Sequence, residues 1–229
     1  MTLYGVDLVV LDSPEEAASA VADELAEAAR KGLSIVLTGG KSPGRAYELA
    51  AEREPDWSRA ALWWGDERCV PPNDERSNFR LAREKLLDSI AAQPREVHRI
   101  RGEAGAETAA AEYDGDLEGA SLDLVLLGIG PDGHAASLFP GQPTLEERER
   151  RAIPAEAKLE PFVERVTLTL PVLCSAPEVL FLVTGEGKAD AVEQAFGRPP
   201  SPEAPSSLIR SAAGSTRVIA DAAAAAGLN

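Results

Sequence analysis

The chain has 229 residues, of which 44% are hydrophobic, and its formal net charge is −15. This length suits a single globular domain over residues 1–229, and no stretch is long and apolar enough to span a membrane. The negative charge argues against nucleic acid as a partner, because such binding needs many lysines and arginines to neutralise phosphates. A small anionic substrate remains compatible, since distant surface charges are screened beyond about 10 Å.

The cysteine and histidine content indicates the compartment and argues against a metal centre. The chain has two cysteines, Cys69 and Cys174, without Cys-x-x-Cys spacing, and two histidines. We therefore expect free thiols in a reducing, cytoplasmic environment, with no bound metal or cofactor. Residues 1–12 lack the basic flank of a secretory signal and predict a strand instead. No apolar stripe demands a partner, so we expect a monomer.

The first predicted elements after this strand are a helix over residues 13–32 and a short strand over residues 33–37. Ser13 and Glu16 have the spacing of a capping box, and Pro14 suits the first helical position. Apolar residues then recur at helical spacing as far as Gly32, which is a typical helix stop.

The alternation of apolar strands and helices continues along the chain. Strands are predicted at residues 61–64, 122–127, 179–183 and 216–219, and helices at residues 78–90 and 107–117, with a last short helix after Asp221. This order implies an α/β fold, with an open, mainly parallel, Rossmann-like sheet flanked by helices. In residues 164–170, Thr167 and Thr169 alternate with apolar residues, which predicts a half-exposed strand in a small additional antiparallel element.

Four unusual loops directly follow the four most apolar strands. They comprise residues 38–45, 65–68, 128–134 and 184–188. The carboxyl ends of parallel strands lie on one edge of a sheet, where ligands of such folds bind. We therefore expect the four loops to form one site.

The first loop has the character of an anion site. Gly39 and Gly40 allow a tight turn, and a helix is predicted to begin near Ser42, where free backbone N–H groups favour a negative charge. Lys41 and Arg45 add positive charge, and the Ser42 hydroxyl adds a hydrogen bond. The alternative is an ordinary strand–helix turn with solvated basic side chains. The loop has neither Walker nor dinucleotide spacing.

The third loop carries the strongest catalytic candidate, His134. An imidazole suits proton transfer from water near neutral pH, and Asp132 is close enough in sequence to orient it or to bind a substrate hydroxyl. The alternative is a histidine that only hydrogen-bonds within a turn. The Gly-x-Gly-x-x-Gly spacing of residues 128–133 also matches the motif that binds a nicotinamide cofactor. However, the strand–helix–strand unit with a following acidic residue is not evident. For His98, on a predicted strand, we expect a structural role.

The second and fourth loops supply further charged candidates. Arg68 is suited to holding a substrate oxygen, with Asp66 positioning it, although an exposed salt-bridged turn is the simpler interpretation. Lys188 follows Gly-x-Gly near a predicted helix start. A second phosphate ligand and a solvated lysine are equally compatible with that pattern.

At these segments the chain resembles the 6-phosphogluconolactonase family, within the wider group that includes glucosamine-6-phosphate deaminase. Residues 38–43 are similar to the family's Ser-Gly-Gly-Ser-Thr-Pro phosphate loop, and residues 64–68 with 77–78 to its second signature. Residues 128–141, 184–188 and 205–208 resemble the remaining motifs in order. Departures from the family are Lys41 in place of a small hydroxyl residue, Ala135 in place of Thr and Arg217 in place of Trp.

The resemblance implies hydrolysis of 6-phospho-D-glucono-1,5-lactone to 6-phosphogluconate, a step of the oxidative pentose phosphate pathway. It implies that His134 promotes attack of water on the lactone carbonyl and that Arg68 assists. It places Ser42, Arg45 and Lys188 near the phosphate. One alternative is a sugar-phosphate deaminase or isomerase with Asp66 as its base, and another is a sugar-phosphate-binding regulator without catalysis.

Overall fold

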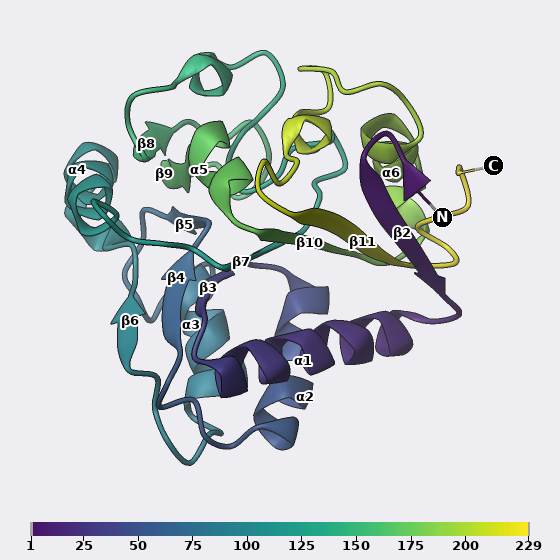
Figure 1. The fold of residues 1–229 in the computed structure, drawn as a ribbon. Helices are drawn as coiled ribbons and strands as arrows, with labels where there is room; N and C mark the ends of the chain where they lie inside the picture. The colour runs from purple at the N-terminus through teal and green to yellow at the C-terminus, as the bar shows by residue number, and fades with distance from the viewer. Residues whose placement is uncertain (1, 229) are drawn as a thin grey trace.

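The computed structural model describes residues 2–228 and contains an eight-stranded sheet with helices on both faces (Figure 1). The strand order is β1-β2-β11-β10-β7-β3-β4-β6, and all neighbours are parallel except β1 and β2. The strands are β1 (Thr2–Leu3), β2 (Val6–Leu11), β3 (Ser34–Leu37), β4 (Ala61–Trp64), β6 (Glu96–His98), β7 (Leu124–Leu127), β10 (Glu178–Val183) and β11 (Ser215–Asp221). The predicted open, mainly parallel α/β fold is confirmed, and the expected first strand is a short hairpin.

The helices are α1 (Pro14–Lys31), α2 (Lys41–Arg53), α3 (Asn78–Ala82), α4 (Ala106–Asp116), α5 (Leu170–Ser175) and α6 (Ala189–Phe196). The Ser13 hydroxyl accepts a hydrogen bond from the N–H of Glu16, and Gly32 ends α1 with φ +76°. The helix predicted over residues 78–90 begins as α3 and continues as a π-helical turn, Arg83–Leu87. After Asp221 the chain forms turns instead of the predicted helix. Among residues 2–228, no helix is long and apolar enough to cross a bilayer.

A second, three-stranded antiparallel sheet lies on the face of the main sheet opposite α1 and α2 (Figure 1). Its order is β5 (Asp66–Arg68), β9 (Arg165–Leu168) and β8 (Ala152–Ala155). This confirms the predicted antiparallel element but not its exposure. Thr167 and Thr169 are fully buried. Their hydroxyls donate to the carbonyls of Leu168 and Arg150, and these internal partners make burial of a threonine possible.

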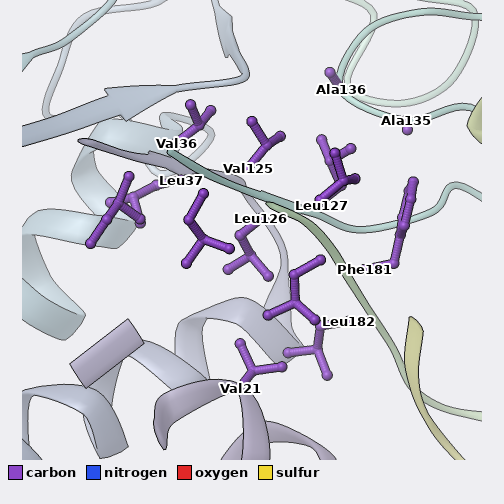
Figure 2. Close-up of a cluster of buried hydrophobic side chains, with 14 of the residues drawn as sticks. Val21, Val36, Leu37, Val125, Leu126, Leu127, Ala135, Ala136, Phe181 and Leu182 are labelled. Atoms are coloured by element: carbon purple, nitrogen blue, oxygen red, sulfur yellow. The ribbon is translucent and has the colours of Figure 1, made fainter. Parts of the chain in front are cut away.

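The hydrophobic core continues from α1 through the main sheet to the third predicted loop. Figure 2 shows Val21 of α1 on one side of the β7 residues and Ala135 and Ala136 on the other. All these side chains are buried. The loop that carries His134 therefore rests directly on the packed core, which gives the site a rigid base.

Candidate active site

The four predicted loops meet at the carboxyl ends of β3, β4, β7 and β10, where they surround a cavity of about 530 Å³. The lining includes Gly39 and Gly40 from the first loop, Asp66 and Arg68 from the second, residues 128–131 and His134 from the third, and Lys188 from the fourth. The second of these segments is not an exposed turn, because it forms strand β5 of the small sheet. The sequence-based expectation that the four loops share one edge is confirmed.

His134 lines this cavity and forms a close pair with Asp132. The Nδ1 atom of His134 lies 2.5 Å from Oδ1 of Asp132, and the same oxygen accepts the backbone N–H of His134 at 3.2 Å. A carboxylate at Nδ1 favours the tautomer with the proton there and leaves Nε2 free to accept one. Burial acts to raise the pKa of Asp132, but the hydrogen bonds and charge of His134 outweigh it, and the net pKa lies below the ordinary value.

The glycines of the third loop serve this pair rather than a dinucleotide. A β-carbon at Gly130 would lie 2.0 Å from the His134 ring, and Gly133 has φ +81° and lies against Ala204. The dinucleotide fingerprint also requires a helix directly after the glycines. In the described part of the chain the next α-helix is α5, so the nicotinamide alternative is rejected.

Asp66 is buried and fully engaged in hydrogen bonds. Its Oδ2 accepts the hydroxyl of Ser137 at 2.6 Å, and its Oδ1 accepts the side-chain amide of Asn78 at 3.0 Å. The guanidinium of Arg165 lies 3.9 Å from Oδ2. The Asn78 amide in turn packs against Gly39, where a β-carbon would lie 2.0 Å from Oδ1 of Asn78. Asp66 thus ties the first, second and third loops together.

Arg165 is a cavity residue that the sequence analysis missed. It stands opposite Arg68 in the β5–β9 pairing, so both side chains project from the same face of the small sheet. Arg165 is 3% exposed, and its guanidinium lies 5.7 Å from the ring centre of Phe139. Burial lowers its pKa, while the charge of Asp66 opposes that shift. The sequence offered only an arginine near the start of a predicted strand, and the burial of that strand is seen in the structure alone.

Their place in the wall of the larger cavity makes Arg68 and Arg165 candidate anion ligands. The Nε atoms of Arg68 and Arg165 have no hydrogen-bond partner among residues 2–228. Arg68 donates through Nη1 to the carbonyl of Arg76 at 2.5 Å, which fixes its guanidinium, and Arg165 donates to the carbonyl of Pro161 at 3.3 Å. Because both arginines line the larger cavity, their positive charge can act on an anionic group bound there.

A second cavity of about 430 Å³ adjoins the first and shares Gly39, Gly40 and Lys188 with it. Lys41 and Ser42 line it at the N-terminus of α2, whose N-cap residue Gly40 provides no side-chain hydrogen bond. The hydroxyls of Ser42 and Thr184 lie 2.5 Å apart. Free N–H groups and the helix dipole make this a suitable place for an anion.

Lys188 connects the two cavities. Its Nζ donates to the carbonyl of Ile129 at 2.7 Å. Burial lowers the pKa of Lys188, and the charge of Asp132 opposes the shift. Lys188 is half-buried and lines both cavities, so its side chain lies at the site.

Arg45, in contrast, lies outside both cavities. Its Nη2 contacts Glu15 at 2.6 Å, and its Nη1 contacts Glu48 at 3.0 Å. Position 45 faces the start of α1, so this arginine joins two helices. The expectation that Arg45 lies near a phosphate is corrected.

Two further polar residues, Glu67 and His98, have structural roles. Glu67 accepts hydrogen bonds from Ser77 and from the backbone of Asn78 and Phe79, which fixes the start of α3. His98 stacks on Trp63 with ring centres 3.8 Å apart, in agreement with the structural role expected for it. In the described ranges, no three histidine, cysteine or carboxylate side chains form a metal-binding group.

Comparison with known proteins shows the family. Residues 12–218 match the family model described as glucosamine-6-phosphate isomerases/6-phosphogluconolactonase. A 6-phosphogluconolactonase of Streptomyces coelicolor is 39% identical over 219 residues, which cover 87% of this chain and 84% of that protein. A 6-phosphogluconolactonase of Mycobacterium tuberculosis is 38% identical over 194 residues, covering 75% and 76%.

Solved structures agree with this result. The 6-phosphogluconolactonase of Trypanosoma brucei matches with a TM-score of 0.87 at 26% identity, covering 99% of this chain and 100% of that one. A monomeric glucosamine-6-phosphate deaminase has a TM-score of 0.86 at 19% identity, which shows the shared fold alone. The chain belongs to the family of glucosamine-6-phosphate isomerases and 6-phosphogluconolactonases.

Proposed function

We propose that this protein hydrolyses 6-phosphogluconolactone to 6-phosphogluconate, with His134 as the general base. The observation that carries the proposal is the 2.5 Å contact between Nδ1 of His134 and Asp132, where His134 lines a cavity that Arg68, Arg165 and Lys188 also line. The relatives described above are named 6-phosphogluconolactonases, and this supports the same reaction for the present protein. We further propose that the enzyme works as a cytoplasmic monomer.

The reaction needs one base and stabilisation of one negative oxygen. Nε2 of His134 takes a proton from water as the water oxygen bonds to the lactone carbonyl carbon. The carbonyl oxygen becomes negative in the tetrahedral intermediate. The bond from this carbon to the ring oxygen then breaks, and the proton held by His134 passes to the leaving ring oxygen. The products are a free hydroxyl and a carboxylic acid, which releases its proton to solvent and becomes a carboxylate, with no metal required.

The cations divide between the two ends of the substrate in this proposal. Arg68 and Arg165, side by side on β5 and β9, hold the reacting end and stabilise the developing negative oxygen. The phosphate lies at the N-terminus of α2, between Ser42 and Lys188. Binding there orients the ring against His134.

The environment of Asp66 argues against the deaminase alternative. That alternative needs Asp66 as a base, with a carboxylate oxygen free to take a substrate proton. Both oxygens already accept hydrogen bonds, from Ser137 and Asn78, and the residue is 4% exposed. In our proposal Asp66 positions Ser137 and Arg165. The intact pair of His134 and Asp132 argues against a regulator without catalysis.

The test is to incubate the protein with freshly made 6-phosphogluconolactone and, separately, with glucosamine 6-phosphate. We expect acid release from the first above the spontaneous rate and no ammonia release from the second. His134→Ala should retain the fold and lower the hydrolytic rate by about 10²–10⁴-fold. Ammonia release, or normal turnover by a folded His134→Ala protein, would contradict the proposal.

A further inference from the structure

Strands β3 and β4 of the main sheet remain paired with each other up to Leu37 and Trp64, but each loses its other neighbour just before the loops of the site. The β3–β7 pairing ends at Val36, two residues before Thr38, and the β4–β6 pairing ends at Trp63. The backbone N–H and C=O of Thr38 and of Trp64 therefore need other partners, because both residues are buried.

A tyrosine hydroxyl takes the place of the missing strand at each of these two points. The hydroxyl of Tyr47 accepts the N–H of Thr38 at 2.9 Å and donates to the C=O of the same residue at 2.6 Å. The hydroxyl of Tyr113 does the same for Trp64, at 2.8 Å and 3.0 Å. Each tyrosine hydroxyl thus bonds both the backbone N–H and the backbone C=O of a single residue.

Both tyrosines come from helices outside the loops they hold. Tyr47 lies on α2, the helix whose N-terminus follows Gly40, and Tyr113 lies on α4. They are among the largest fully buried side chains, with exposures of 0% and 1%. Burial raises the pKa of both phenols above the ordinary value, so both hydroxyls remain protonated donors.

We propose that Tyr47 and Tyr113 are positioning residues of the reaction, each fixing the place from which one loop enters the site. Thr38 is followed directly by Gly39 and Gly40, which lead to the N-terminus of α2. Trp64 is followed by Gly65 and by strand β5, which carries Asp66 and Arg68. Tyr47 therefore controls the phosphate end, and Tyr113 controls the reacting end.

This division rests on the proposed lactonase function and gives the two tyrosines different kinetic signatures. Tyr47→Phe should raise KM for the phosphorylated lactone by about 10-fold and leave kcat within a factor of about two. Tyr113→Phe should lower kcat by about 10-fold with KM little changed. Both effects are smaller than the roughly 100-fold cost of a full ångström of misplacement, because the strands themselves remain paired.

Inorganic phosphate provides a second readout, as a competitive inhibitor. Its inhibition constant should rise by about 10-fold in Tyr47→Phe and stay unchanged in Tyr113→Phe. Thr169→Val is the matched control, because it removes another fully buried hydroxyl, which donates to the carbonyl of Arg150, away from the cavities. This control should lose thermal stability without either kinetic change.

Unchanged kinetics in both folded tyrosine variants would overturn the inference, as would the same non-selective loss in all three variants. Absence of lactone hydrolysis by the unaltered protein would instead refute the proposed function.

If a tyrosine variant fails to fold, amide hydrogen exchange on the unaltered protein tests the inference instead. Phosphate should slow exchange of the Thr38 amide and not of the Trp64 amide. Bound phosphate and the Tyr47–Thr38 hydrogen bonds favour the same position of the first loop, so each stabilises the other. Slowing at neither residue, or equally at both, would overturn the inference.

Discussion

The α-carbon of Gly130 lies directly against the His134 imidazole: a β-carbon at position 130 would come within 2.0 Å of Nδ1 and 2.8 Å of Oδ1 of Asp132. Gly130 is not among the glycines with positive φ, so its backbone would accept alanine. The need for glycine here is therefore steric, and it arises from the close pair of His134 and Asp132.

We therefore expect Gly130→Ala to separate His134 from Asp132 while the fold is retained. The turnover number should fall by about 100-fold, the loss typical of misplacement by an ångström. Gly115→Ala is the control, because open space surrounds that glycine on α4. Steady-state kinetics and thermal melting of both variants measure the effect. Normal turnover of a folded Gly130→Ala protein would show that the pair tolerates displacement.

Asp132→Asn tests the orientation of the imidazole. The asparagine amide can donate to Nδ1, which favours the tautomer with the proton on Nε2 and removes the acceptor that water needs. We expect kcat to fall by about 10²–10⁴-fold, with KM little changed. A loss in KM alone would instead indicate that Asp132 binds a substrate hydroxyl.

The position of the site was predictable from the sequence, because apolar strands followed by glycine-rich loops specify one edge of a parallel sheet. The side chains within the loops were less predictable. Arg45 has the charge and spacing of a phosphate ligand, yet the helical turn directs it to Glu15. The local sequence does not predict which tertiary contact a long side chain such as that of Arg45 will make.

Arg165 and Thr167 are buried, although the local sequence predicted a half-exposed strand. Alternating threonines predicted a half-exposed strand, but the segment that follows the third loop packs over β9, and the backbone N–H of Ser137 donates to the Thr167 hydroxyl. The same packing buries Arg165 beside Arg68. These contacts join residues about 30 to 100 positions apart, so local periodicity contains no information about them.

The pairing of Arg68 with Arg165 leads to a comparison of lysine substitutions. Lysine keeps the charge but loses the planar group of donors, so Arg68→Lys and Arg165→Lys should both lower kcat, by about 10-fold or more. The loss should be the same for the phosphorylated lactone and for plain gluconolactone. A loss confined to the phosphorylated substrate would place the phosphate, rather than the reacting end, between these arginines.

Lys188 should contribute a single charge-assisted contact to the phosphate. Such a contact is worth about 1.5–3 kcal/mol, so Lys188→Ala should lower kcat/KM by about 10–150-fold and reduce the preference for the phosphorylated lactone. Arg45→Ala is the matched control: it also removes a cation near α2, but from outside both cavities, and its kinetics should be unchanged. Equal losses in the two variants would indicate a general effect of charge.

The pH dependence of product binding tests the same lysine. Burial lowers the pKa of Lys188, so its positive charge is lost at a lower pH than is ordinary for a lysine. Affinity for 6-phosphogluconate should therefore fall as the pH rises through this lowered pKa. In Lys188→Arg the affinity should stay level over the same range, because a guanidinium remains charged. Calorimetric titration with the stable product avoids spontaneous lactone hydrolysis at alkaline pH. An equal decline in both proteins would assign the titration to another group and leave the phosphate to Lys41 and the N-terminus of α2.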